Sequence, residues 1–170
     1  MPAAARSSQF PPVGISHAFS AVIAAPFGAV GIIVRGQFIE EIRFLPPGQA
    51  SAPATNSVAE MAARQLESYL ADPDFRFDLP LAGRGTNFRR RIWSAIAAIP
   101  RGRTRTYGDL AHDANSAARA VGQACGDNPF PLVIPCHRVV AASGLGGFAH
   151  DRGGFLLDTK RWLLRHEGAV

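Results

Sequence analysis

Cysteine is scarce in this sequence: only two of the 170 residues, Cys125 and Cys136, carry a thiol. Two thiols cannot build the multi-disulfide framework of small secreted domains, so we expect a reducing compartment. This would be the bacterial cytoplasm, or the nucleus of a eukaryotic cell. Neither cysteine belongs to a C-x-x-C pair, and no two histidines stand at helical spacing. The sequence therefore predicts no metal site, and nothing in it indicates a bound cofactor.

Long apolar runs are also missing. No stretch approaches the roughly 20 apolar residues that a membrane-spanning helix needs, so we expect no membrane segment. Residues 1–12 combine Ala, Ser and Pro with a single Arg, and no long apolar stretch follows them. We interpret them as a loose arm rather than a secretion signal. Because apolar residues make up 47% of the chain and charged residues 18%, the sequence is typical of a folded protein.

Lysine is almost absent, since all but one of the 18 basic residues are arginine. Residues 84–170 hold 13 of these basic residues and 6 of the 13 acidic ones, a balance of +7, whereas residues 1–83 have a balance of −2. Arginine suits contacts with phosphates and base edges. The asymmetry favours a polyanionic partner for the second half, although a solvated basic surface would give the same balance.

The first half has the pattern of an α/β domain, a small antiparallel sheet plus a helix, over residues 1–83. Runs rich in Val, Ile and Phe at 19–25, 29–34 and 38–44 are separated by turn residues at hairpin spacing. Apolar residues then recur at helical spacing between 55 and 70. Alternation at Phe75, Phe77 and Leu79 predicts a short edge strand. Residues 83–85, Gly-Arg-Gly, mark the expected joint between the two domains.

The second half, residues 84–170, is expected to be an all-helical domain. Thr86 or Asn87 can cap a helix that Pro100 ends. Thr106, followed three residues later by an aspartate, indicates a capping box and a short helix. Asn115 or Ser116 can cap a second short helix over 117–125, so the pair predicts a helix-turn-helix. A glycine-rich loop at 144–154 precedes a last amphipathic helix over 155–167.

Cys136 is the candidate nucleophile. A cysteine reacts as the thiolate, yet an ordinary thiol with a pKa of about 8.5 is mostly protonated at neutral pH. The adjacent His137 can take the proton if a bent backbone or a water brings the two groups together, and Pro135 is suited to fix such a bend. A buried small side chain next to a surface histidine is the alternative interpretation for an isolated Cys-His pair.

A series of motifs supports the nucleophile. The hexapeptide IPCHRV at residues 134–139 resembles the active-site motif of the O6-alkylguanine-DNA alkyltransferases. Further motifs of that family follow in the same order from residue 85 to residue 168: GT-x-F, IW, IP-x-G, TY-x-x-LA, RAVG, NP and LL-x-HEG. A hexapeptide can arise by chance, but an ordered series of this length is unlike chance. The first half resembles the family only loosely.

The resemblance implies direct-reversal DNA repair, in which an alkyl group leaves O6 of guanine and binds irreversibly to Cys136. O4-alkylthymine is a second candidate substrate. His137 would deprotonate Cys136 through a water, Glu167 would orient His137, and Asn128 would tie the turn below the site. Tyr107 would crowd the target phosphate and give a proton to the guanine ring. The enzyme would be a self-inactivating monomer that needs no other protein.

The resemblance also implies how double-stranded DNA is bound. Base chemistry inside a duplex requires the nucleotide to leave the stack, and Arg119 would fill the gap. The second short helix would enter the narrow minor groove, where small side chains are needed. The other residues expected at the DNA on this basis are Ala117, Ala118, Ala120, Gly122, Arg138 and Thr106. The pocket for the flipped guanine would be formed by Val139, Val140, Phe148 and Ala149.

This sequence departs from the family in the 144–154 loop. The family has an aromatic residue, a serine and two glycines close before the last helix, whereas here Phe148 and Ala149 are followed by His150, Asp151 and Arg152. Because the loop is long and rich in glycine, we expect a mobile lid that leaves one wall of the pocket less defined than usual. A backbone N–H at Ala149 can still donate a hydrogen bond to O6.

Two other functions compete with alkyl transfer. A non-enzymatic module could bind alkylated bases and recruit other proteins, but relatives of that kind replace the cysteine that is present here as Cys136. A transcriptional regulator could use the helix-turn-helix, but no dimerisation region is evident. Cys125 is expected to be a small buried side chain on the second short helix.

Overall fold

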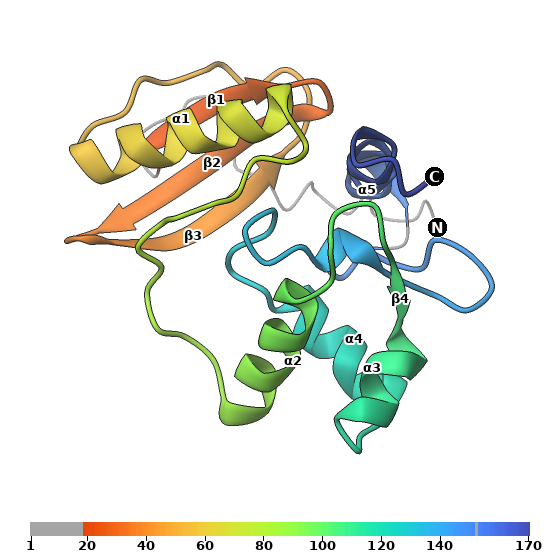
Figure 1. The fold of residues 1–170 in the computed structure, drawn as a ribbon. Helices are drawn as coiled ribbons and strands as arrows, with labels where there is room; N and C mark the ends of the chain where they lie inside the picture. Colours follow the sequence, from red (N-terminus) through yellow and green to blue (C-terminus); the bar gives the residue numbers. More distant parts are fainter. Residues whose placement is uncertain (1–18, 152) are drawn as a thin grey trace, which may run out of the picture.

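The computed structural model describes residues 19–151 and 153–170, so the expected loose arm at 1–12 and Arg152 lie outside the described residues. Figure 1 shows a small sheet with one helix beside it and, apart from these, a group of helices. None of the helices in the described ranges is both long and apolar enough to cross a membrane.

The sheet is a three-stranded antiparallel meander in the order β1-β2-β3. Its strands are β1 (Ala21–Ala25), β2 (Gly28–Arg35) and β3 (Phe38–Leu45), and two-residue turns join them. Helix α1 (Ser57–Ala71) packs on the sheet, and the side chain of Asn56 accepts a hydrogen bond from the Ala59 amide to cap it (Figure 1). The predicted small sheet plus helix is confirmed, because alternation and helical spacing are local signals.

The predicted edge strand at Phe75, Phe77 and Leu79 is wrong. The Gln65 side chain accepts from the Asp78 amide and donates to its carbonyl, each at 2.9 Å, so the backbone there is bonded to α1 rather than to the sheet. The chain meets the sheet only later, where Leu81 forms a single parallel bridge with Ile39.

The second half is helical, as predicted, and contains α2 (Asn87–Ala97), α3 (Tyr107–Asp113), α4 (Ala118–Gly126) and α5 (Gly154–His166). Thr86 caps α2, and the capping box between Thr106 and Asp109 is present. The structure adds a short parallel pair of strands, β4 (Arg105–Thr106) and β5 (Val139–Val140). Helices α3 and α4 pack against each other as the two arms of the helix-turn-helix.

The predicted side-chain cap of α4 is wrong. Ala117 occupies the N-cap position without a side-chain hydrogen bond, so neither Asn115 nor Ser116 caps the helix. Asn115 instead has a positive φ of 50° and makes the tight turn between α3 and α4, a conformation that asparagine adopts more readily than most residues. The amide of Ser116 reaches back to the Ala111 carbonyl at 2.8 Å.

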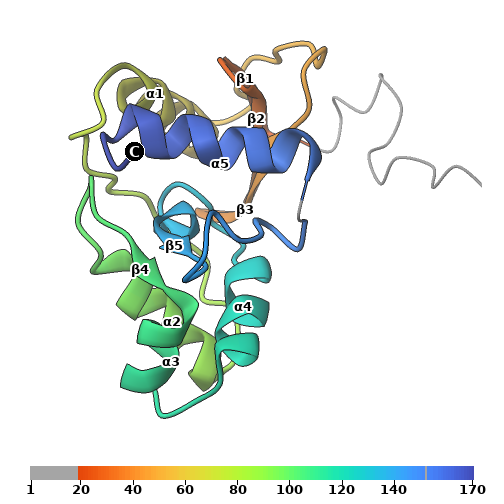
Figure 2. The same ribbon diagram turned by 90° about the vertical axis from the view of Figure 1, so that its right-hand side faces the viewer.

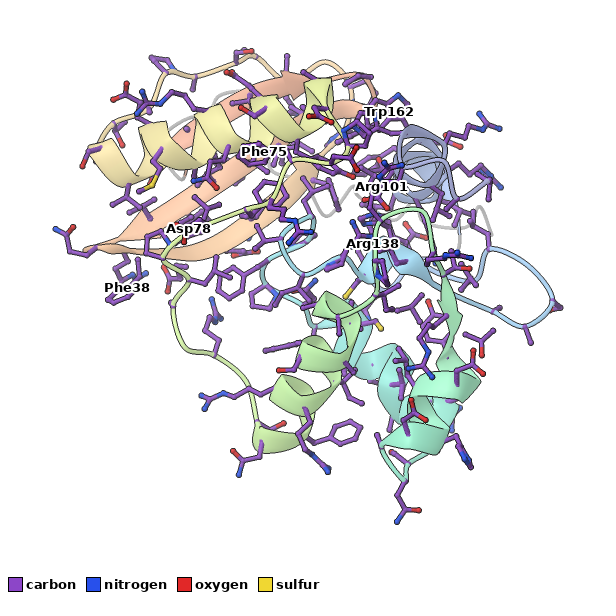
Figure 3. All side chains as sticks on the ribbon, in the orientation of Figure 1. Phe38, Phe75, Asp78, Arg101, Arg138 and Trp162 are labelled. Carbon is purple, nitrogen blue, oxygen red and sulfur yellow. The ribbon has the colours of Figure 1, made fainter. Side chains whose placement is uncertain are left out.

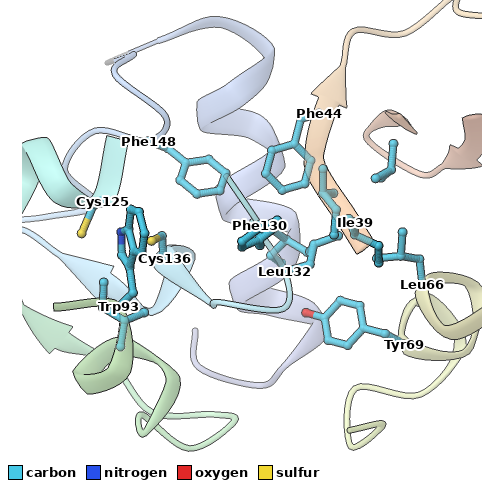
Figure 4. Packing of buried hydrophobic residues seen from close by; sticks show 14 of the residues in the cluster. Ile39, Phe44, Leu66, Tyr69, Trp93, Cys125, Phe130, Leu132, Cys136 and Phe148 are labelled. Atoms are coloured by element: carbon cyan, nitrogen blue, oxygen red, sulfur yellow. The ribbon is translucent and has the colours of Figure 1, made fainter. Parts of the chain in front are cut away.

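One hydrophobic core runs through both halves of the chain. The ring centroids of Phe44 in β3 and Phe148 in the second half are 5.4 Å apart (Figure 4). The same distance separates Phe27 from Trp162 of α5. Figure 2 shows α5 running between the sheet region and the helix-turn-helix. The division at residues 83–84 stays a prediction, and the shared core means that both halves hold α5 in place.

Candidate active site

Cys136 lies in a one-turn 3-10 helix, η1 (Cys136–Arg138), which directly follows Pro135. The amide group of Asn128 holds this turn from below: Nδ2 lies 2.8 Å from the Ile134 carbonyl and 3.1 Å from Sγ of Cys136, while Oδ1 accepts from the Phe130 amide at 2.9 Å. The bent backbone that the sequence required at Cys136 is present.

His137 and Glu167 form a buried pair behind the cysteine. Nε2 of His137 lies 2.8 Å from Oε1 of Glu167, off the line of a well-formed hydrogen bond, and both side chains are at most 1% exposed. Glu167 also accepts from Tyr69 Oη at 2.8 Å and from two nitrogens of Arg138 at 2.8 and 2.9 Å. The carboxylate therefore has the position expected of a group that orients His137.

The surroundings set the charge of this pair. Burial alone raises the pKa of Glu167, but the adjacent His137 and the hydrogen-bonded Arg138 outweigh it and hold that pKa at about 2. Burial lowers the pKa of His137, and the attraction of Glu167 only partly opposes this. At neutral pH the carboxyl is ionised and the imidazole is neutral, so His137 is free to accept a proton.

Arg138, expected at the DNA, has its hydrogen-bond partners inside the protein, and its DNA contact stays a prediction. Its guanidinium is bonded inside the protein to Glu167 and to the Ile99 carbonyl at 2.6 Å, and the side chain is only 13% exposed. Figure 3 shows Arg138 in the interior of the molecule, away from its rim. A single charged carboxylate cannot be buried without such a partner, and this requirement explains why the arginine points inward.

A cavity of about 500 Å³ leads from the surface to Cys136. Seven of the residues predicted to act in the reaction or in binding line it: Tyr107, Ala118, Arg119, Gly122, Cys136, Phe148 and Ala149. The remaining wall consists of Gln123, Cys125, Gly126, Gly147, His150 and Asp151. The volume is within the range of small-molecule sites, and the cavity brings α4, the cysteine and the 144–154 loop together.

Val139 and Val140 are absent from the lining of this cavity, and their role in the guanine pocket stays a prediction. Val139 is fully buried in β5, and its carbonyl accepts a hydrogen bond from Nζ of Lys160 at 2.7 Å. The predicted DNA residues Ala117, Ala120 and Thr106 also lie outside the cavity lining. The Thr106 oxygen accepts from the Asp109 amide and caps α3.

Lys160 was not predicted as a site residue. Its ammonium group is fully buried, donates to the carbonyls of Val139 and Gly147 at 2.7 and 2.8 Å, and lies 5.8 Å from the ring centroid of Tyr107. Burial lowers its pKa to about 8. The lysine ties β5 to the loop on the cavity wall. The sequence did offer one signal for a special role of Lys160: it is the one lysine of an arginine-rich chain and stands among the apolar residues of the last helix.

Tyr107 borders the cavity at the start of α3. Its hydroxyl lies 3.2 Å from the Gly147 carbonyl, to which it donates. Burial raises the pKa of Tyr107 above its usual range, so the hydroxyl keeps its proton at neutral pH. A hydroxyl that keeps its proton on the cavity wall can donate a hydrogen bond to a group bound there.

Cys125 is buried, as predicted, but its position next to the nucleophile was missed. Both cysteines line the cavity, and Figure 4 shows them at the same end of the core, near Trp93. The neighbouring Cys125 thiol and burial raise the pKa of Cys136, against the opposing effects of Asn128 and Lys160. The resting nucleophile is therefore a protonated thiol that needs a base.

We expect Cys125→Ala to speed the reaction of Cys136 at neutral pH by roughly three- to tenfold, because a larger share of the thiol is then ionised. The pH–rate profile for a soluble alkyl donor should move toward acid. Cys125→Ser serves as the matched control, since it keeps a polar neighbour and should change the profile less. A slower reaction, or an unmoved profile, would show that Cys125 does not influence the nucleophile.

Residues 148–151, part of the loop expected to be a mobile lid, form a hydrogen-bonded tight turn. Phe148 and Asp151 exchange backbone hydrogen bonds of 2.7 and 2.8 Å, and Phe148 is buried.

Within the described ranges, no three histidine, cysteine or acidic side chains are grouped as they would be around a metal ion.

Comparisons with known proteins identify relatives of this chain. Residues 87–169 match the family described as "6-O-methylguanine DNA methyltransferase, DNA binding domain". The chain is 38% identical over 152 residues to a methylated-DNA–protein-cysteine methyltransferase of Mycobacterium tuberculosis, covering 85% of this chain and 89% of that protein. It is 34% identical over 165 residues to a protein of the same name from Shigella flexneri, covering 86% and 93%.

Solved structures are similar as well. The crystal structure of the Mycobacterium tuberculosis protein in complex with DNA matches with a TM-score of 0.70 and 35% identity. The match covers 87% of this chain and 91% of that chain. The similarity therefore extends over both halves of the molecule, including the first half, where the sequence resemblance was loose.

Proposed function

This chain belongs to the methylated-DNA–protein-cysteine methyltransferase family, and on that premise we propose that it repairs DNA by moving the alkyl group from O6 of guanine onto its own Cys136. The observation that carries the proposal is the position of the thiol. Sγ of Cys136 borders a cavity formed with α4 of the helix-turn-helix, and the buried His137–Glu167 pair lies behind it. Nucleophile, base and orienting carboxylate are thus present in one place.

The proposed step is an in-line displacement. His137, neutral at rest, takes the thiol proton through a water. The Cys136 sulfur then forms a bond to the alkyl carbon while the bond from that carbon to O6 breaks. The electron pair of the broken bond goes to the guanine, which gains a proton from Tyr107. The product thioether is a poor leaving group, so each protein molecule reacts once.

The DNA is bound through α4 in the minor groove, with the alkylated guanine turned out of the stack into the cavity. The side chains of Ala118 and Gly122 leave room for close approach, and Arg119 lies between them at the cavity mouth. The excess of basic residues in the second half provides side chains that can contact the phosphates of the DNA backbone. O4-alkylthymine remains a second candidate substrate in the same cavity.

A lesion-binding module without chemistry would have the same helix-turn-helix and cavity. It would have no use for a buried thiol held by Asn128 and backed by a neutral histidine. These features favour transfer over binding alone.

The test is incubation with a duplex that carries a labelled O6-methyl group. The label should move to the protein in an amount equal to the protein present, and peptide mass spectrometry should find it on Cys136. Label that stays on the DNA, or many methyl groups removed per protein molecule, would refute the proposal.

Arg119→Ala tests base flipping. If Arg119 holds the flipped state, repair of the duplex should fall at least about tenfold further than reaction with free O6-benzylguanine, which needs no flipping. If the arginine only contacts phosphate, affinity for all duplexes should weaken by the same factor. The slope of log affinity against log salt concentration should then fall by about one. Arg161→Ala is the matched control, because that arginine pairs with Asp158 on an exposed face of α5. Equal losses on both substrates would refute the intercalating role.

A further inference from the structure

The turn at Phe148–Asp151 has an unusual backbone. Its two central residues, Ala149 and His150, have positive φ angles of 50° and 66°. Positive φ at both central positions is the pattern of a type I′ turn, which strongly favours glycine or asparagine. Two other residues in this conformation are unfavourable and persist only where their surroundings hold them. Contacts of the turn with the rest of the protein must therefore stabilise it.

The contacts that hold the turn come from Gly126, the last residue of α4, and from Asp127, which follows it. Nε2 of His150 lies 2.9 Å from Oδ1 of Asp127, whose Oδ2 lies 2.5 Å from Arg89 on α2. The imidazole occupies the space above Gly126: a Cβ atom on that glycine would lie 2.2 Å from the ring. Gly126 thus leaves the room that the ring needs, and Asp127 binds the ring there.

This contact closes one side of the cavity. Gly126 and His150 both line it, together with Phe148, Ala149 and Cys136. The wall that faces the alkyl group is thus part of a turn whose position depends on a contact with α4. His150 belongs to the glycine-rich loop at residues 144–154.

We propose that His150 is a positioning residue: seated on Gly126 and bonded to Asp127, it fixes the loop wall of the cavity and so limits the size of the alkyl group that Cys136 accepts. The inference rests on the proposed transfer reaction and adds a determinant of its substrate range. When the contact is lost, the wall moves outward, and bulky groups gain relative to methyl.

The experiment measures second-order rate constants for two duplexes, one with O6-methylguanine and one with O6-benzylguanine. The ratio of benzyl to methyl rates should rise about tenfold in His150→Ala, the range expected when a pocket wall changes by a few atoms. Gly126→Ala should raise the ratio by a similar factor, because its methyl group expels the imidazole while His150 remains in the sequence. The double variant Gly126→Ala, His150→Ala should have the same ratio as each single variant, since each single variant already removes the same contact.

Two further variants separate positioning from general damage to the fold. His150→Gln keeps a side-chain donor for Asp127 and should restore part of the wild-type ratio. Gly144→Ala is the matched glycine substitution in the same loop: nothing lies within 4 Å of its added Cβ, so its ratio should equal that of the wild type. Thermal unfolding of each variant verifies that it is folded.

The outcomes distinguish this inference from the proposed function. If the wild type transfers neither group, the function itself is refuted. If the wild type transfers methyl groups but His150→Ala and Gly126→Ala leave the ratio unchanged or lower it, the positioning role of His150 is refuted. Additive effects in the double variant would likewise overturn it, because the two residues would then act separately.

Discussion

Replacing Cys136 by serine is expected to slow methyl transfer on the order of a millionfold, as the loss of a nucleophile does in other covalent enzymes. Serine fits the same 3-10 turn and keeps a group near the Asn128 amide, so the fold should persist. An alcohol is far harder to ionise than a thiol, and a neutral His137 is too weak a base to activate it fully. The measurement is label transfer from an O6-methylguanine duplex under single-turnover conditions.

DNA affinity provides the control for this variant. Because the basic residues and α4 are unchanged, binding to alkylated and to undamaged duplex should stay within about threefold of the wild type. Cys125→Ala, the other cysteine of the cavity, should retain full transfer. If transfer survives in Cys136→Ser and disappears in Cys125→Ala, the alkyl acceptor is Cys125 and the assignment to Cys136 is refuted.

Most of the correct predictions rest on patterns between residues that are close in sequence. Alternating residues gave the meander, helical spacing gave α1 and α5, and the pair Thr106 and Asp109 gave a capping box, because each pattern involves neighbours in sequence. The bend at Cys136 is also a local feature, because the adjacent side chains of Cys136 and His137 point apart in an extended segment and a bend can bring them together. The motif series added the likeness to a family, which composition and spacing could not supply.

Apart from the wrong cap of α4, what the sequence did not show concerns contacts between distant parts of the chain. The family resemblance suggested a DNA contact for Arg138, but a carboxylate 29 residues away binds its guanidinium inside the protein. Cys125 and Lys160 were missed because each looked like an ordinary helix residue, and only the packing of α4 and α5 brings them to the cysteine. The tight turn at His150 depends on Gly126, whose role no local pattern indicates.

The largest loss of stability is expected from Glu167→Ala. Its carboxylate is fully buried and accepts hydrogen bonds from Tyr69 and Arg138 besides facing His137. Removing it leaves a guanidinium without its partner in the interior, which typically destabilises a protein by about 3–5 kcal/mol. For a protein of this size, the midpoint of thermal unfolding should fall by roughly 6–20 °C.

Glu167→Gln isolates the charge from the shape. The amide fills the same space and keeps an oxygen that can accept from Arg138, so the loss at neutral pH should be smaller than for alanine. The variant no longer stabilises the ionised form of His137, and transfer should slow by roughly a hundredfold, the lower part of what a general base contributes. A slower reaction in a variant that is still folded separates the role of the carboxylate in chemistry from its role in stability.

The pH dependence of unfolding gives a test with a definite sign. The pKa of Glu167 is about 2 in the folded protein, below its ordinary value of 4.5, so the unfolded chain takes up the proton first as the pH falls. The stabilisation, worth roughly 3 kcal/mol for a depression of this size, is therefore complete above about pH 4.5 and is lost progressively toward pH 2. Glutamine does not titrate, so the stability difference between wild type and Glu167→Gln in urea should be constant from pH 7 to 5 and shrink at lower pH. A difference that grows as the pH falls would mean that the buried carboxyl is protonated in the native protein, and that His137 and Arg138 do not hold its charge.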